Sequence, residues 1–330
     1  MAVTSQRSLT TPADTPLTPE RQARFFRLAV TSLGATIAVI LWGAYVRISG
    51  SGAGCGSHWP TCNGEVIPHP KSIATLIEVT HRLTSGALSL LIAAQTLLGI
   101  RWFPRGHRAR GAAVASAVLL VTEAALGAGL VVFEKVAKDT SLGRAGWSAA
   151  HLVNTFLLVA FTALTAFWTR VPPRGRLGRA QRIELGAALV GMLVVGVAGT
   201  IAALGDTLFP AKSLVEGFAQ DLSPTAHFLL RLRVLHPIAA VVVAATLAHR
   251  LPASLGPGGD PLRARLGWSL IGLIGGQVAL GFLNWVLLAP TWLQLVHLSL
   301  ADGCWVALVL FVAASGPVRP AGDLASSTAP

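Results

Sequence analysis

Long runs of apolar residues follow one another along the whole sequence, and they constrain the fold more than any other feature. About 20 apolar residues are enough to cross the hydrocarbon core of a bilayer as a helix. Lipid offers no hydrogen-bond partners, so the backbone of such a run must satisfy itself, and a helix does this. Only 12% of the residues are charged, against about a quarter in soluble domains. The sequence therefore predicts an all-α integral membrane protein.

Eight runs of this kind are separated by short polar stretches. Each is long enough to span the bilayer, with ends defined to within a few residues. The first 25 residues (1–25) and the last stretch (315–330) are polar, and we expect both to be disordered tails. The expected transmembrane helices are Phe26–Ile48, Ile73–Trp102, Ala109–Phe133, Trp147–Trp168, Ile183–Leu204, Phe228–His249, Leu266–Leu288 and Trp292–Ala314.

Arginine clusters indicate how these spans are oriented. Every cluster precedes an odd-numbered span or follows an even-numbered one, and cytoplasmic loops carry an excess of Lys and Arg. We therefore expect a cell-membrane protein with both termini in the cytoplasm, surrounded by lipid. The loops 49–72, 134–146 and 205–227 would then lie outside. The net charge of +12 comes largely from the cytoplasmic loops, and no basic patch with interleaved aromatic residues indicates nucleic-acid binding.

The two halves of the sequence resemble each other. The segment from Glu123 to Gly127 in the third span matches the segment from Gln277 to Gly281 in the seventh. Histidines near the start of the second, fourth, sixth and eighth spans keep the same order. With four spans in each half, the halves share one orientation, which predicts two parallel four-helix-bundle repeats. The expected halves are residues 26–170 and 183–314, joined by a cytoplasmic linker at 171–182.

Four histidines occupy the predicted spans at a single depth. His81 and His236 lie near the start of the second and sixth spans, and His151 and His297 near the start of the fourth and eighth. These even-numbered spans all run from outside to inside, so the four imidazoles share a level in the membrane. A single His in a span is as often a hydrogen-bonded core residue as a ligand. Four at matching depth favour ligands.

Haem is the ligand type that fits the spacing of these histidines. Neutral imidazole binds zinc, copper and haem iron. A zinc site usually brings closely spaced ligands, whereas these residues are tens of positions apart on different helices. A planar haem clamped between two helices takes one axial His from each. The expected pairs are His81 with His151, and His236 with His297.

Charged residues near these histidines make the two predicted sites unequal. Glu78 shares a helix face with His81 and could orient a ligand or shuttle a proton. The matching position in the second half holds Arg233. Together with Arg82 and Arg231, Arg233 lies at the same outer level, where these arginines could pair with haem propionates. The alternative for each arginine is a side chain that extends to the membrane interface.

Three cysteines complete the set of chemically informative residues. Cys55 and Cys62 flank a His-Trp-Pro segment in the first outer loop. The outside is oxidising, so a disulfide between them is the expected state, and an exposed, strained bond could be redox-active. Cys304 lies within the eighth span, where we expect a small buried apolar side chain.

These residues together resemble haem A synthase over nearly the whole chain. The most specific part is the loop from Cys55 to Cys62, followed by the Glu-x-x-His helix from Glu78 to His81. The other motifs are weaker alone. They are Gly43-Ala-Tyr-Val-Arg47 with the glycine-rich 49–54 stretch, Cys62-Asn63-Gly64, His151-Leu152-Val153-Asn154, the His236 segment and His297-Leu298.

The resemblance implies a reaction and a division of labour. It implies that the C8 methyl of haem O is hydroxylated twice and loses water, giving the formyl group of haem A for terminal oxidases. The N-terminal half would hold the substrate haem O between His81 and His151, with Glu78 as the essential carboxylate. The C-terminal half would hold haem b, with His236 and His297 as iron ligands.

The resemblance also bears on partners and on the disulfide. It implies a haem O-producing farnesyltransferase as a partner, and it leaves the electron donor and a homo-oligomeric state open. Cys55 and Cys62 match the family's first-loop pair. Many members carry a second pair in the third outer loop, which this chain lacks, so a role that needs two disulfides is not expected here.

Two other classes of protein compete with this interpretation. One is a dihaem b-type electron carrier or quinol oxidoreductase. A carrier that moves electrons across the membrane stacks its haems at different depths, whereas the four histidines here share one. The other is an assembly or transport protein with structural histidines, which would be colourless when purified. Motif similarity favours the synthase over both, although fold likeness alone would not decide function.

Overall fold

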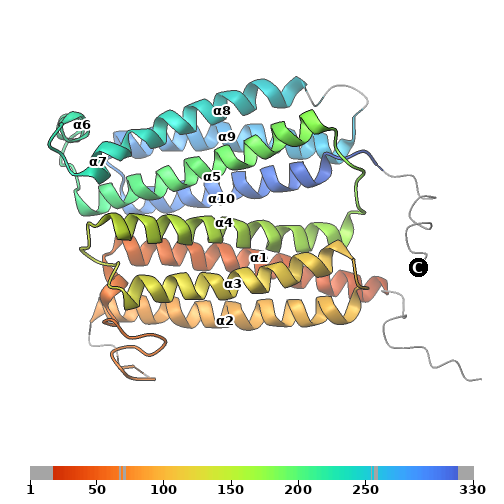
Figure 1. Cartoon of the computed structure of the whole chain (residues 1–330), viewed down its shortest axis with the longest axis horizontal. Helices are drawn as coiled ribbons and strands as arrows, with labels where there is room; N and C mark the ends of the chain where they lie inside the picture. The colour runs from red at the N-terminus through yellow and green to blue at the C-terminus, as the bar shows by residue number, and fades with distance from the viewer. Residues whose placement is uncertain (1–17, 67, 70–71, 254, 256–258, 319–330) are drawn as a thin grey trace, which may run out of the picture.

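The computed structural model describes residues 18–66, 68–69, 72–253, 255 and 259–318, and within these ranges it contains helices and no β-strand (Figure 1). Eight helical segments are long and apolar enough to cross a membrane, so the predicted all-α, eight-span membrane fold is confirmed. The helices are α1 Pro19–Ile48, α2 Ile73–Trp102, α3 Arg108–Val132, α4 Leu142–Arg170, α5 Arg179–Leu208, α6 Leu214–Leu222, α7 Phe228–Arg233, α8 Leu235–Ala253, α9 Pro261–Val286 and α10 Thr291–Ala314.

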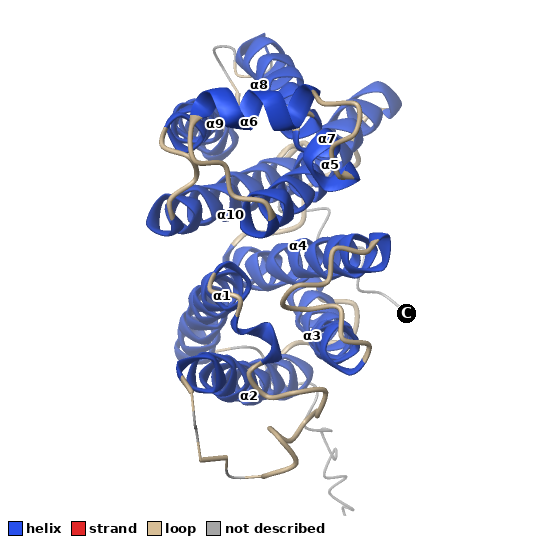
Figure 2. Ribbon diagram, turned by 90° about the vertical axis from the view of Figure 1, so that its left-hand side faces the viewer, coloured by secondary structure: helices blue, strands red, loops and turns tan. Residues whose placement is uncertain are grey.

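The spans form two groups of four, seen end-on in Figure 2. In the first group α1 contacts α2 and α4, and α3 contacts the same two helices, so the four close into a ring. In the second, α5, α8, α9 and α10 contact one another in the same cyclic way. Helices α4 and α10 lie between the groups. There the indole of Trp305 donates a hydrogen bond of 2.7 Å to the carbonyl of Phe156.

Helices α3 and α9, which correspond in the proposed repeat, end in the same way. Each helix is followed by a non-glycine residue in the left-handed region, Glu134 (φ 54°) and Leu288 (φ 57°). The next amide, of Lys135 or Ala289, donates at 2.7 Å to the carbonyl five residues earlier. This is the hydrogen-bond pattern of a Schellman cap, usually built on glycine. The repeat itself stays a prediction, and this shared detail supports it.

The first helix begins earlier than the sequence analysis expected. It starts at Pro19 rather than Phe26, because Thr18 caps it by accepting a hydrogen bond from the amide of Arg21, and proline suits the first helical position. Residues 1–17 and 319–330 of the expected tails lie outside the described residues. The short stretch 315–318 pairs with the linker, since the amide of Gly175 donates to the carbonyl of Pro317 at 2.7 Å.

The segment between α5 and the sixth span contains a helix that was not predicted from the sequence. Helix α6 begins after Ser213, whose hydroxyl accepts from the amide of Glu216.

The sixth span is divided at Val234 into α7 and α8. Pro237 explains the break, because its ring clashes with the carbonyl four residues earlier and it has no N–H to donate.

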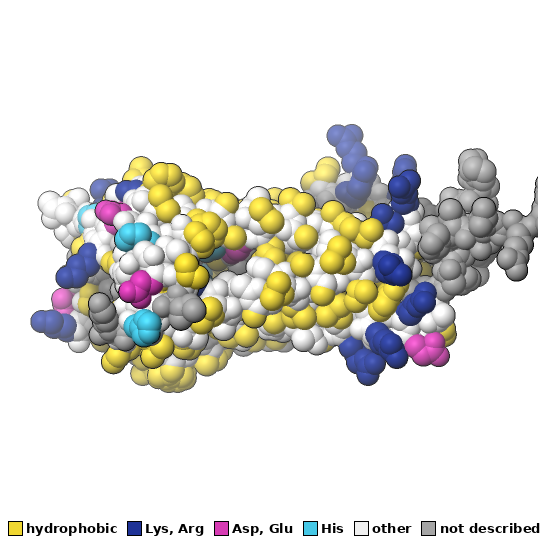
Figure 3. All heavy atoms as spheres, turned by 90° about the horizontal axis from the view of Figure 1, so that it is seen from below, with side chains coloured by type: hydrophobic (Ala, Val, Ile, Leu, Met, Phe, Trp, Pro, Cys, Tyr) yellow, Lys and Arg dark blue, Asp and Glu magenta, His cyan; other side chains and the backbone are white. Residues whose placement is uncertain are grey.

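Charged side chains gather at the two ends of the bundle, as the face in Figure 3 shows, while apolar side chains cover its middle. We call one end the arginine end. It contains Arg101 and Arg170, where α2 and α4 finish, and Arg179, where α5 begins. We call the other end the histidine end, because His81 and His236 lie near it. The arginines at the arginine end lie in or beside the loops whose Lys and Arg content predicted the orientation of the spans.

Candidate functional site

Each of the four predicted histidines lies against a glycine on the preceding span of its own half. A Cβ atom added to that glycine would stand 3.0–3.9 Å from the imidazole ring. The glycine therefore lets the ring approach the neighbouring backbone, in the space between two helices. The contacts join Gly43 to His81, Gly127 to His151, Gly199 to His236 and Gly281 to His297. The same contact recurs in all four helix pairs, which also supports the repeat.

The structure brings His236 and His297 together in the C-terminal half. Their ring centres are 6.4 Å apart and their planes are nearly perpendicular, at 87°. Two in-line metal–imidazole bonds of about 2 Å, plus about 1 Å from each ring nitrogen to its ring centre, place ring centres about 6 Å apart. The two rings could therefore bind one metal atom from opposite sides.

The partners of these two rings differ. The Nδ1 atom of His236 lies 3.1 Å from the carbonyl oxygen of Val195. A proton on Nδ1 would bond that oxygen and leave Nε2 as the ligand atom. On the opposite side, the amide Nε2 of Gln277 lies 3.2 Å from Nε2 of His297. Gln277 would have to move for that nitrogen to bind a metal.

The N-terminal pair carries unsatisfied nitrogen atoms. Nδ1 of His81 and Nδ1 of His151 are both buried, and neither makes an aligned hydrogen bond within the described structure. A carboxylate oxygen of Glu123 nevertheless lies 3.2 Å from Nδ1 of His151. Nδ1 of His297 in the C-terminal half is likewise buried without a hydrogen-bond partner among the described residues, so this feature does not distinguish the two pairs.

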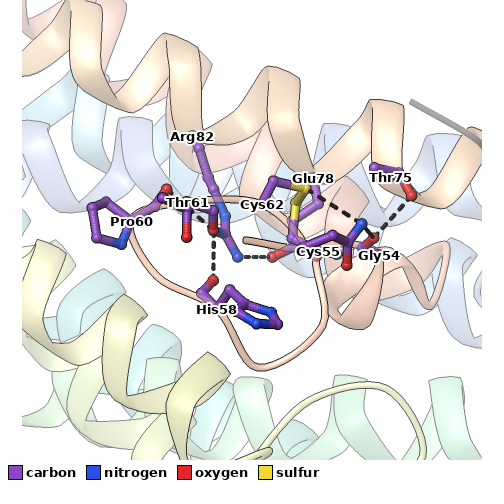
Figure 4. Close-up of polar contacts among 10 residues, drawn as sticks. Gly54, Cys55, His58, Pro60, Thr61, Cys62, Thr75, Glu78 and Arg82 are labelled. Atoms are coloured by element: carbon purple, nitrogen blue, oxygen red, sulfur yellow. Dashed lines mark hydrogen bonds and ion pairs between the residues drawn. A yellow bond between two sulfur atoms is a disulfide. The ribbon is translucent and has the colours of Figure 1, made fainter. Parts of the chain in front are cut away.

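The loop between α1 and α2 is folded onto the start of α2 through Glu78 (Figure 4). Glu78 is 3% exposed. One of its oxygens accepts from the amide of Cys55 at 2.9 Å, and the other accepts from the guanidinium of Arg82 at 2.5 Å. Thr75 adds a hydroxyl bond of 2.8 Å to the carbonyl of Gly54. The carboxylate therefore anchors the loop to α2.

Arg82 is held by the same loop. Its guanidinium donates to the carbonyl oxygens of His58 at 2.8 Å and Thr61 at 2.7 Å, besides pairing with Glu78 (Figure 4). The suggested propionate contact would therefore have to be shared with these acceptors. Gly54 allows this close packing, because a Cβ there would lie 2.5 Å from the backbone of Ala74.

Cys55 and Cys62 form a disulfide in the structure, as predicted. Both sulfurs are buried beneath the loop, and Cys304 is a buried free thiol, also as expected. Closing a loop of this size restricts the unfolded chain and stabilises the folded loop by about 2–3 kcal/mol. The bond therefore preserves the shape that places the amide of Cys55 on Glu78.

We expect alkylation of the denatured, unreduced protein to label one thiol, that of Cys304, and to label all three after reduction. Mass spectrometry of the alkylated chain gives this count directly. A Cys55→Ser/Cys62→Ser variant should unfold at a lower temperature, with Cys304→Ser as the control that keeps the loop intact. Labelling of three thiols before reduction would show that the bond is absent in the mature protein.

The other two arginines singled out from the sequence lie differently. Arg231 is exposed. Arg233 is bound by two carboxylates, Asp206 on α5 at 2.8 Å and Asp221 on α6 at 2.7 Å. Arg233 thus fastens α6 across the histidine end of the C-terminal half. Its donors are occupied much as those of Arg82 are.

Arg47, the last residue of the Gly43-Ala-Tyr-Val-Arg47 motif, connects the two halves of the structure. Its guanidinium, on α1, donates to the carbonyl of Ala203 at 2.8 Å and to the hydroxyl of Thr207 at 2.9 Å, both on α5. A charged residue within a span normally has such a partner. The partner was not predictable, because it lies in the other half of the sequence.

One cavity in the described part of the chain lies at the arginine end, far from the histidines. It has a volume of about 490 Å³ and is lined by Arg108, Arg174 and Arg182 among others. The described residues also contain no cluster of three or more His, Cys, Asp or Glu side chains that could hold a metal ion. Any metal at the histidine end would therefore depend on paired histidines.

Comparison with known proteins gives one family and two kinds of relative. The family model COX15-CtaA, described as cytochrome oxidase assembly protein, matches residues 26–309. A Thermus thermophilus protein named protoheme IX farnesyltransferase is 46% identical over 289 residues, which are 86% of this chain and 47% of that protein.

Shorter matches reach proteins named heme A synthase. The Bacillus mycoides protein is 40% identical over 111 residues, covering 33% of this chain and 36% of that protein. A Bacillus cereus protein is 42% identical over 104 residues, covering 32% of this chain and 33% of its own length. The chain thus spans about half the length, or less, of the curated relatives it matches.

Proposed function

Since the chain belongs to the COX15-CtaA family of cytochrome oxidase assembly proteins, we propose that it is a haem A synthase. It oxidises the C8 methyl of haem O to a formyl group through two hydroxylations and loss of water. The observation that carries the proposal is the inequality of the two His pairs. The N-terminal pair lies near two glutamates, Glu78 and Glu123, whereas the C-terminal half has Arg233 and Gln277 at these positions.

The C-terminal half is assigned the resident haem b. His236 and His297, whose ring centres lie 6.4 Å apart, would hold the haem iron, and the carbonyl of Val195 is positioned to fix the tautomer of His236. When bound, such a haem supplies one-electron chemistry. Beside His297 lies the neutral amide of Gln277, where the N-terminal half has Glu123, and this suits a cofactor that is retained rather than modified.

The N-terminal half is assigned the substrate, haem O. His81 and His151 would hold it, and the glycines behind them set how far the rings reach into the site. Glu78 is buried beside His81 and is held in one orientation by Cys55 and Arg82. An ionised carboxylate accepts only, so it can take up a proton as the methyl group is oxidised. The disulfide loop covers this carboxylate and limits the access of water.

A second candidate function comes from the name of the Thermus relative, transfer of a farnesyl group to protohaem. Less than half of that protein matches this chain, so its named activity can reside in the part outside the match. We therefore assign that activity to a partner. In this proposal the enzyme that makes haem O works beside this chain.

The proposal includes a location in the cell membrane, with both termini in the cytoplasm. It is supported by the arginines at one end of the spans and by the disulfide loop at the other. The test of function is expression in a host that makes haem O and lacks its own haem A synthase. Haem A should appear in the membranes of that host. Its absence, with the protein folded and haem b bound, would contradict the proposal.

We expect Gly43→Ala to weaken haem binding in the N-terminal half by about tenfold or more, since groups that orient a metal-bound His typically matter to this extent. The new Cβ would lie 3.0 Å from the ring of His81 and force it to move. Gly34→Ala, on the same helix, is the matched control, because nothing lies within 4 Å of its Cβ. Haem content per protein measures the effect. Equal content in both variants would contradict the role given to Gly43.

A further inference from the structure

Glu123 lies within the N-terminal ring of helices and has three polar partners on α4. It projects from α3 towards α4. One oxygen accepts a hydrogen bond of 2.6 Å from the amide of Asn154. The other accepts from the hydroxyl of Thr155 and lies 3.2 Å from Nδ1 of His151. Two of these three partners donate to the carboxylate, and the third, the imidazole, is able to.

The orientation of this carboxylate is fixed by a second layer of contacts. The side-chain amide of Asn154 also donates through its nitrogen to the carbonyl of Leu119 at 2.8 Å. The oxygen of the same amide accepts from the hydroxyl of Thr122 at 2.6 Å. Both hydrogens and the oxygen of that amide are therefore used. Because Asn154 presents an N–H donor to Glu123, the Glu123 atom that faces it has to be an acceptor. The Glu123 side chain therefore has little freedom to turn.

The corresponding residue in the other half makes a different contact. Gln277 approaches Nε2 of His297, at 3.2 Å, and Nδ1 of His297 has no partner within the described residues. Glu123 instead approaches Nδ1 of His151. A metal binds the other nitrogen, Nε2, when Nδ1 carries the hydrogen bond. The glutamate thus meets the side of its imidazole that remains free when the other side binds iron.

We propose that Glu123 is a positioning residue for His151. It accepts a hydrogen bond from Nδ1–H of His151, so that Nε2 becomes a strongly donating ligand to the substrate haem. The inference rests on the proposed function, because it requires haem in the N-terminal half. A carboxylate partner fixes the tautomer and the ring orientation, and it increases the basicity of the ligand. A stronger donor favours ferric over ferrous iron and lowers the potential of that haem relative to one held by an unassisted His.

The substitution Glu123→Gln tests this role with little change of shape. The oxygen of the new amide must face Asn154, so its NH2 group would face His151. An NH2 donor there requires an unprotonated Nδ1, which puts the proton on Nε2 and blocks the ligand atom. Glu123→Asp keeps a negative acceptor and is the conservative variant. Glu184→Gln makes the same chemical change at an exposed position on α5 and is the control.

The experiment uses full-length protein purified from a host that makes haem O. Extracted haems are identified by mass and counted per protein, and a redox titration gives the midpoint potential of each bound haem. We expect Glu123→Gln to lower the affinity of the N-terminal site for its haem by about 10–100-fold and to raise the potential of any haem that remains there. Haem b in the C-terminal half should keep its content and potential. Glu123→Asp should retain more substrate haem than Glu123→Gln.

The outcomes separate this inference from the proposed function. Wild-type protein that carries haem b alone would overturn the proposed substrate site, and the inference with it. Wild-type protein with a second haem that Glu123→Gln retains at the same content and potential would overturn the inference alone. Loss of both haems to the same extent would make Glu123 a residue of the fold and would also overturn it.

Discussion

Glu78→Gln is expected to abolish haem A formation while haem b stays bound. The amide keeps the shape of the side chain and can still accept from the amide of Cys55, but it cannot take up a proton. Loss of a general acid or base typically slows a reaction by about 10²–10⁴-fold. Haem A in host membranes and haem b on the purified protein are the two quantities to measure.

The choice of glutamine follows from the structure of the loop. Either variant removes the ion pair with Arg82, but Glu78→Ala would also leave the Cys55 amide without its acceptor, which glutamine retains. A buried group left unpaired costs about 1–3 kcal/mol. An alanine variant could therefore fail through the fold. If Glu78→Gln loses haem b and folded protein in parallel, the residue serves the fold. If it makes haem A at the normal rate, the catalytic role is wrong.

His236→Ala is expected to remove haem b from the purified protein almost completely. Changes to groups that only orient a ligand cost about 10–100-fold in metal affinity, and loss of the ligand itself should exceed that. His249→Ala, near the arginine end of the same helix α8, is the matched control and should leave haem b unchanged. Optical spectra and haem extraction measure the content.

The same variant also tests whether the N-terminal haem site is independent of the C-terminal one. Since the two His pairs belong to separate four-helix rings, His236→Ala should leave haem bound between His81 and His151. Retention of haem b after His236→Ala would contradict the assignment of the C-terminal pair. Loss of both haems together would contradict the independence of the two sites.

The spans could be predicted because their physical cause is local. Apolar runs match the thickness of the bilayer, and Ile73–Trp102 has the same bounds in the structure as in the sequence analysis. Helices α1, α4 and α9 begin earlier than expected, where Thr18, Ser141 and Asp260 accept hydrogen bonds from the first-turn amides. Helix α6 was missed although Ser213 and Glu216 carry the Ser-x-x-Glu signal of a helix start. The break before α8 was also signalled, by Pro237.

The candidate site was predictable only in its residue types. Periodicity and depth selected the four histidines, but the glycines that contact them could not be chosen among the 34 in the chain. The partners of Glu123, Arg82 and Arg233 depend on which helices pack together and on how loops fold back. The sequence shows Glu123 only as the counterpart of Gln277, and the distance to His151 suggests its role.

The two halves of the protein have similar scaffolds but chemically unequal sites. The same helix ends and the same His–Gly contacts occur on both sides, so the scaffold gives each half a comparable space. The difference lies in a few polar side chains. Glu78 and Glu123 occur where the second half has Arg233 and Gln277. Two similar sites can thus serve different purposes, one for a substrate and one for a cofactor.

The most direct test of the central claim, two haem sites of different function, is the mass of the haems extracted from wild-type protein purified from a host that makes haem O. The account predicts haem b together with haem O, haem A or a hydroxylated intermediate. Haem b alone would contradict it, and would favour an electron carrier in which the N-terminal histidines and Glu78 have another role.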